Sequence, residues 1–117
     1  MAYLLLIVEP LGQREERGVE GGQRAYASML DFTGELKAAG VLMASSSLAT
    51  ASTRLRRPAA PGPALVTDGP FAETKEMLGG FFLLDCLTRE EALAWAERCP
   101  AATWATVEVR ETGPCFT

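Results

Sequence analysis

Hydrophobic and polar residues follow each other along this chain in patterns that predict four strands. Residues 2–8 form a continuous apolar run that ends at Glu9-Pro10, and residues 81–84 form a second such run, as is typical of buried strands. Residues 41–48 predict a strand that turns polar through its three serines. Residues 104–111 alternate: Ala105, Val107 and Val109 lie on one face, and Trp104, Thr106, Glu108 and Arg110 lie on the other.

Two further segments have the periodicity of helices. From about Gln23 to Ala39, apolar residues recur at spacings of three and four, and Gly40 follows where a left-handed residue commonly ends a helix. Thr88 and Glu91 form a capping box at the start of a second helix, which Pro100 ends. The inner stripe of this second helix is predicted to be Ala92, Trp95, Ala96 and Cys99.

Two segments between these elements are predicted to lie outside the helices and the main sheet. Residues 10–22 contain four glycines and five charged residues without periodicity, which predicts a mobile loop, either a solvated connection or a lid. Residues 51–57 and 64–67 look extended, and the proline-rich stretch 58–63 between them is incompatible with regular structure. We therefore expect a β-hairpin arm over residues 51–67.

Without the arm, the order of elements is strand, helix, strand, strand, helix, strand. This order predicts a single α+β domain over residues 1–117, with the ferredoxin-like split βαβ arrangement and an antiparallel sheet. Two helices cover only one face of such a sheet, whereas strands 2–8 and 81–84 are apolar on both. A second copy of the chain would cover the open face, so we expect a homodimer in the form of a dimeric α/β barrel.

Composition narrows the range of functions. The 117 residues carry a net charge of −4, which argues against broad nucleic-acid binding. Histidine is absent and the three cysteines are widely spaced, so we expect no bound metal, no cofactor and no disulfide framework, with the cytoplasm as the simplest compartment. The run Leu4–Val8 is too short to span a membrane.

The run Val66-Thr67-Asp68-Gly69-Pro70-Phe71-Ala72-Glu73-Thr74-Lys75-Glu76, followed by Leu78-Gly79-Gly80-Phe81, resembles the signature of the DGPF proteins within the YCII-related family. The resemblance implies a dimeric α/β barrel and bacterial proteins of uncertain function. Some occur alongside extracytoplasmic-function sigma factors, and a few relatives are cofactor-free lyases, dehalogenases or isomerases. YCII-type relatives are thought to use a histidine-aspartate pair. This chain has no histidine, so that catalytic pair does not carry over.

The signature segment supplies candidate site residues. A turn at Asp68-Gly69-Pro70, with Gly69 at positive φ, would hold Asp68, Glu73, Lys75 and Glu76 near a cleft between the arm and the sheet. Asp68 and Glu73 are the candidate catalytic acid and base. The alternatives are a purely structural turn and a solvated short helix containing Glu73, Lys75 and Glu76.

Arginines supply the candidate anion-binding groups. Arg110 and Glu108 would face the open side of the sheet, and with Arg54 and Asp68 they could line a pocket for a small carboxylate or phosphate. The alternative is that Arg54 pairs with Asp68 across the hairpin. Tyr26 lies off the apolar stripe of its helix and either presents its hydroxyl to a cleft or packs on the helix flank. Two functions stay open: a small-molecule protein, working as a cofactor-free enzyme by proton transfer, and a non-catalytic module that senses a ligand or contacts a transcription partner.

The chain is expected to sediment as a dimer at micromolar concentration, because a monomer would leave an apolar sheet face in water. Sedimentation velocity measures this directly. A folded, well-behaved monomer at that concentration would contradict the sheet-to-sheet dimer.

Overall fold

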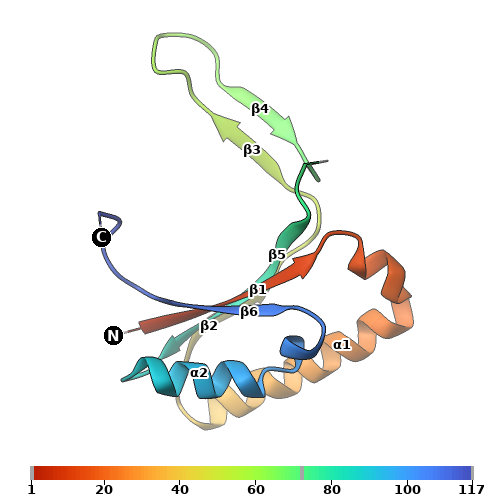
Figure 1. The fold of residues 1–117 in the computed structure, drawn as a ribbon, viewed down its shortest axis with the longest axis vertical. Helices are drawn as coiled ribbons and strands as arrows, with labels where there is room; N and C mark the ends of the chain where they lie inside the picture. Colours follow the sequence, from red (N-terminus) through yellow and green to blue (C-terminus); the bar gives the residue numbers. More distant parts are fainter. Residues whose placement is uncertain (1, 72, 117) are drawn as a thin grey trace.

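The computed structural model describes residues 2–71 and 73–116, and its centre is a four-stranded antiparallel sheet (Figure 1). The strands are β1 (Ala2–Pro10), β2 (Leu42–Ser47), β5 (Glu76–Asp85) and β6 (Thr106–Glu111), in the order β2-β5-β1-β6. β5 pairs antiparallel with both β1 and β2, which is the split βαβ arrangement. The predicted α+β, ferredoxin-like fold class is confirmed.

Both long helices lie on one face of this sheet (Figure 1). They are α1 (Gln13–Ala38) and α2 (Arg89–Arg98), and a short 3₁₀ helix η1 (Pro100–Thr103) follows α2. The core lies between the helices and the sheet, where the rings of Phe32 and Phe82 meet edge to face with centroids 5.3 Å apart. The fully buried side chains around them include Leu5, Leu36, Leu84, Cys86, Ala92 and Cys99.

The central strands are apolar on both faces, as the sequence indicates. In β1 every second residue, from Tyr3 to Glu9, is buried under the helices, and the residues between them are half-buried on the other face. There Leu4 and Leu6 pair with Leu83 and Phe81 of β5. No described helix covers this second face, which we call the open face (Figure 1).

The predicted arm is present as a separate two-stranded sheet of β3 (Thr53–Arg56) and β4 (Leu65–Asp68). It extends away from the body on the side opposite the helices (Figure 1). Both strands are exposed along their whole length.

Both predicted helix boundary signals are confirmed. Gly40 has a φ of 73°, in the left-handed region that favours glycine at a helix end. The hydroxyl of Thr88 accepts a hydrogen bond from the backbone N–H of Glu91, at 3.1 Å. None of the described helices is long and apolar enough to cross a membrane.

The prediction of a loop over residues 10–22 is wrong. Helix α1 already begins at Gln13, and Gly18, with a φ of 76°, marks a kink inside it. This first part of the helix buries none of its side chains fully, so it has no apolar stripe. Polar contacts attach it to the body, including a 2.6 Å hydrogen bond from Gln13 Nε2 to the carbonyl of Trp104.

Three expectations near other element boundaries are also corrected. Trp104 precedes β6 and lines the helix side of the sheet, because η1 redirects the chain before the strand begins. Glu76 is the first residue of β5 and does not belong to a short helix, because it pairs with Pro10 of β1. Gly69 does not have a positive φ and precedes a cis peptide bond to Pro70. A side chain at Gly69 would collide with Phe71 and Ser52, which explains the glycine.

Burial predicts different reactivity for the three cysteines. Cys86 and Cys99 are buried and Cys115 is exposed, and burial raises the pKa of the Cys86 and Cys99 thiols. Because the thiolate is the reactive form, a thiol reagent should modify Cys115 rapidly in native protein and all three cysteines after denaturation. Mass spectrometry after timed alkylation measures this. Equal rates at all three sites in native protein would contradict the packing described here.

Candidate functional site

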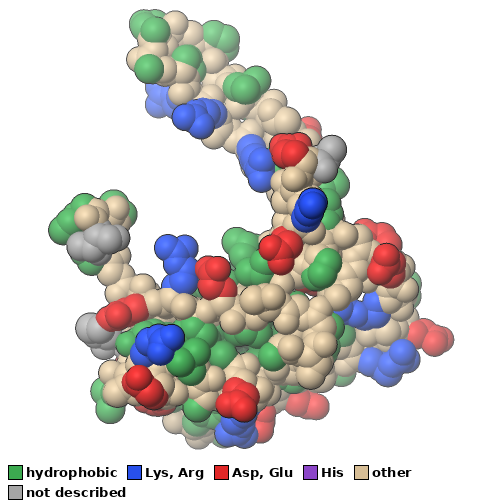
Figure 2. Space-filling view, in the orientation of Figure 1, with side chains coloured by type: hydrophobic (Ala, Val, Ile, Leu, Met, Phe, Trp, Pro, Cys, Tyr) green, Lys and Arg blue, Asp and Glu red, His purple; other side chains and the backbone are tan. Residues whose placement is uncertain are grey.

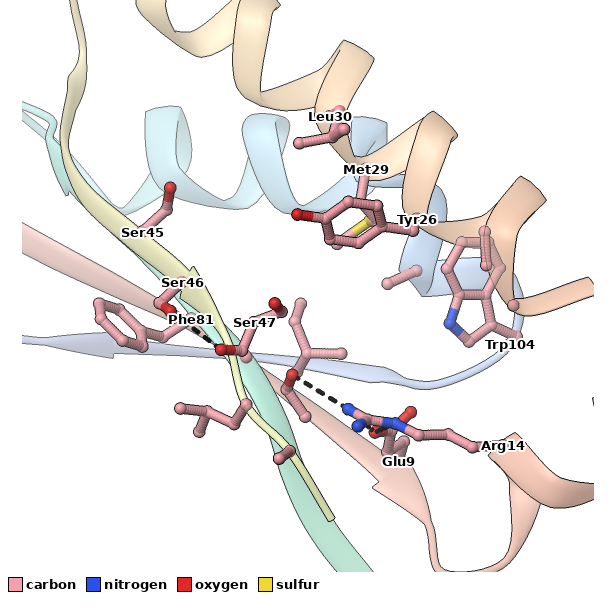
Figure 3. A pocket seen from close by; sticks show the side chains of 18 of the residues that line it. Glu9, Arg14, Tyr26, Met29, Leu30, Ser45, Ser46, Ser47, Phe81 and Trp104 are labelled. Carbon is pink, nitrogen blue, oxygen red and sulfur yellow. Dashed lines mark hydrogen bonds and ion pairs between the residues drawn. The ribbon is translucent and has the colours of Figure 1, made fainter. Parts of the chain in front are cut away.

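A cleft of about 1140 Å³ opens between α1 and the helix-facing side of the sheet (Figure 3). Strands β1, β2 and β5 form one wall, and the middle of α1 forms the other. Apolar side chains such as Met29 and Phe82 line its interior, and polar side chains gather at the end where β1 stops and α1 begins. Its volume and mixed lining are those of a site for a small organic molecule.

A buried ion pair stands at the polar end of the cleft (Figure 3). Glu9 continues the inward-facing series of β1 and is only 4% exposed. The Arg14 side chain donates from Nε to Glu9 Oε1 at 2.8 Å, and a terminal nitrogen lies 2.6 Å from the same oxygen. Arg14 also donates to the carbonyl oxygen of Gly79 at 3.3 Å. The buried carboxylate is thereby paired with a cation, as burial of a charge requires.

A β-bulge makes room for this ion pair. The pairing of β1 with β5 shifts register between Ile7, opposite Gly80, and Val8, opposite Leu78, so Gly79 is the extra residue. A side-chain carbon at Gly79 would collide with the carboxylate of Glu9 and come within 3.0 Å of Arg14. Glycine at this position therefore allows a carboxylate to lie against the sheet backbone.

The remaining walls present hydroxyl groups and aromatic rings. Figure 3 shows Tyr26 on α1 and Ser45 on β2 pointing into the cleft from opposite sides. Within the described part of the chain, the hydroxyls of Tyr26, Ser45 and Ser47 have no hydrogen-bond partner, whereas Ser46 donates to the carbonyl of Ser47. These hydroxyls are available to a ligand.

One cationic side chain at the polar end of the cleft is suited to an anion. Besides the Glu9–Arg14 pair, this end contains Glu15 and Arg17, so acidic and basic side chains balance there. Lys37 lines the far end of the cleft, about 30 Å from Arg17 at the rise of a helix. Arg17 donates to the side-chain oxygen of Gln13 at 3.0 Å, and its guanidinium carbon lies 5.3 Å from the centre of the Trp104 ring. The ion pairs recorded among the described residues do not include Arg17. A guanidinium held against an aromatic ring is suited to carboxylate binding.

The arm residues singled out from the sequence lie outside this cleft. Asp68 accepts a 2.7 Å hydrogen bond from the hydroxyl of Thr53, and Arg54 lies 3.7 Å from the centre of the Phe71 ring. The predicted alternative, an Arg54–Asp68 ion pair, is not among the described ion pairs. Glu73 and Lys75 are exposed between the arm and β5.

Other candidates are divided between the two faces of the sheet. Glu108 and Arg110 lie opposite Leu6 and Leu4 on the open face, as expected, and both are exposed. Because the arm extends away from the sheet, one chain does not bring Arg54 and Asp68 together with them (Figure 1). Tyr26 does line the large cleft, and Glu76 lines a smaller one beside Trp104. The roles assigned to these residues stay predictions.

Sequence reasoning missed Glu9 and Arg14. One signal for Glu9 was present, because an acidic residue continues the inward positions of a strand that is otherwise apolar there. Arg14 lay in the segment taken for a loop. No three His, Cys, Asp or Glu side chains within residues 2–71 and 73–116 are grouped so that they could hold a metal ion.

The chain belongs to the YCII-related domain family, whose model matches residues 1–114. It is also 55% identical over 47 residues to an uncharacterized protein of Rhizobium meliloti (strain 1021). That match covers 40% of this chain and only 36% of the relative, so the chain spans about a third of the length of the curated relative it matches.

Among solved structures, the chain is similar to 5-chloro-2-hydroxyhydroquinone dehydrochlorinase from Burkholderia phenoliruptrix AC1100, determined in complex with 2,5-dihydroxybenzoquinone. The TM-score is 0.54 at 19% sequence identity, and the match covers 97% of this chain and 94% of the other. At this identity the likeness supports the shared fold and does not carry over the enzyme's reaction.

Substituting Gly79 tests the packing of the polar end of the cleft. Gly79→Ala should destabilise the protein by about 1–3 kcal/mol, because the added methyl group displaces the Glu9 carboxylate. Gly34→Ala is the matched control: the site is open and helical, so alanine should be neutral or stabilise by up to about 1 kcal/mol. Urea unfolding gives both values. A Gly79→Ala variant as stable as Gly34→Ala would contradict the described contact.

Proposed function

We propose that this protein is a cytoplasmic homodimer that binds a small anionic organic molecule in the cleft between α1 and the sheet. The observation that carries the proposal is the lining of the cleft: an apolar interior, with Arg17 at the polar end outside the described ion pairs. Aromatic and sulfur-containing side chains would hold the body of the ligand. The cationic end and the unpartnered hydroxyls would orient its acidic group.

The open face supports the proposed homodimer. Leu4, Leu6, Phe81 and Leu83 stay half-buried in a single chain, and an antiparallel sheet with one face in water normally carries polar residues there. Packing two open faces together would remove these side chains from water. It would also bring the candidate residues Glu108 and Arg110 of both copies into the interface.

Catalysis is the second candidate function. A carboxylate that is 4% exposed at the wall of a cleft is a candidate group for proton transfer in a cofactor-free lyase or isomerase-type reaction. The double contact with Arg14 argues for a structural role of Glu9, since two guanidinium nitrogens already contact its Oε1. Binding is therefore the better-supported function. A ligand bound in the cleft without turnover would favour the ligand-sensing module.

The binding proposal is tested with 4-hydroxybenzoate and 2,5-dihydroxybenzoquinone as anionic probes, and benzyl alcohol as a neutral control. In two-dimensional NMR titrations, the anionic probes should shift the amide signals of Ser45, Ser47 and Gly79 and the indole N–H signal of Trp104. Arg17→Gln should weaken binding by about tenfold, the effect of losing one charge-assisted hydrogen bond.

Arg24→Gln provides the matched control, because Arg24 is exposed on the same helix outside the cleft and should leave affinity unchanged. Tight binding of benzyl alcohol with no preference for the anionic probes would contradict the electrostatic part of the proposal. Shifts confined to the arm or the open face would move the site away from the cleft.

A further inference from the structure

The arm formed by β3 and β4 is left without support in a single chain. Its strands pair with each other, and every residue from 51 to 68 is exposed. An isolated two-stranded hairpin is at best marginally stable in water. Leu55, Leu65 and Val66 nonetheless expose 63%, 68% and 56% of their surface. Leu55 and Val66 pair on one face of the hairpin, and Leu65 lies on the other face, opposite Arg56. Exposed apolar side chains on both faces of such a hairpin indicate surfaces that another molecule covers.

The arm also differs from the rest of the chain in charge. Residues 51–68 contain Arg54, Arg56 and Arg57 and a single acidic residue, Asp68. The net charge of −4 therefore divides into +2 on the arm and −6 on the remaining residues. Another copy of this chain presents the complementary charge to the arm, whereas a nucleic acid would be repelled by the acidic body.

The shape of the molecule leaves space for this second copy. The arm and the C-terminal tail both rise on the open-face side of the sheet, and a hollow lies between them (Figures 1 and 2). Basic side chains lie along the side of the arm that faces the hollow, and hydrophobic and charged side chains form its floor (Figure 2). Glu108 lies on the open face and is exposed.

We propose that the arm is a dimer clasp: each arm packs against the acidic body of the second copy of the chain. The inference rests on the homodimer proposed above and adds the contact that stabilises it. Leu55 and Val66 on one face of the hairpin, and Leu65 on the other, would supply the apolar part of the contact. Arg54 and Arg56, on the same face as Leu65, would pair with carboxylates of the other copy, together with Arg57. The clasp explains why a hairpin with no contact to its own core carries exposed apolar side chains and a net positive charge.

Two variants of the full-length chain test the clasp. In the first, a short Gly-Ser linker replaces residues 54–66, and in the second, Arg54→Glu and Arg56→Glu are combined. The matched control combines Arg24→Glu and Arg89→Glu, which changes the net charge equally on exposed helix positions. Sedimentation equilibrium gives the dimer dissociation constant, and circular dichroism checks that the body stays folded, as expected for an arm outside the core.

Both arm variants should raise the dimer dissociation constant at least about tenfold, as expected when several interface side chains are lost, and the control should not. The effect of the charge reversal should shrink at high salt. A dimer equally stable without the arm overturns the clasp but not the sheet-face dimer. A monomeric wild-type protein overturns both.

Two further results also overturn the clasp. One is a control variant that weakens the dimer as much as the arm variants do, and the other is an arm that binds double-stranded DNA at physiological salt. NMR titration of the same variants with 4-hydroxybenzoate reports on the cleft separately.

Discussion

Two helices can cover only one face of a four-stranded antiparallel sheet, and the arrangement of this molecule depends on that limit. Helices α1 and α2 bury the inward side chains of β1 and β5 and leave the other face of both strands to solvent. The strands nevertheless carry half-buried apolar side chains on that second face. A sheet face left in water normally carries polar residues, and this departure is the basis of the proposed homodimer.

The same packing opens a cleft on the covered face. Helix α1 bends at Gly18, and its first turns leave the sheet surface near the end of β1 accessible. The bulge at Gly79 then lets Glu9 lie against the sheet, where Arg14 neutralises it. The ion pair leaves the guanidinium of Arg17, which is in none of the described ion pairs, as the cationic group beside it. Such local fields, more than net charge, decide which small ions bind.

Charge is also distributed unevenly between the arm and the body of the chain. Three arginines lie on the hairpin while the body carries the acidic excess, and the proposed clasp rests on this difference in charge. The cleft lies between α1 and the sheet. The arm extends on the side opposite the helices (Figure 1), so the proposed ligand site and the proposed dimer contact are separate surfaces. A substitution in the cleft therefore tests the ligand site alone, and a substitution in the arm tests the dimer contact alone.

The sequence by itself determined the four strands of the sheet, the hairpin arm, the second helix with its Thr88 cap, and the fold class. Each of these depends on periodicity or on turn residues close together in the chain. Only the tertiary structure decided that residues 13–22 are helical and that Glu9, Arg14 and Gly79 meet. Arg14 and Gly79 are 65 positions apart, and a contact at that separation leaves no periodic trace. The first turns of α1 are held by polar contacts without an apolar stripe, so hydrophobic patterning could not reveal them.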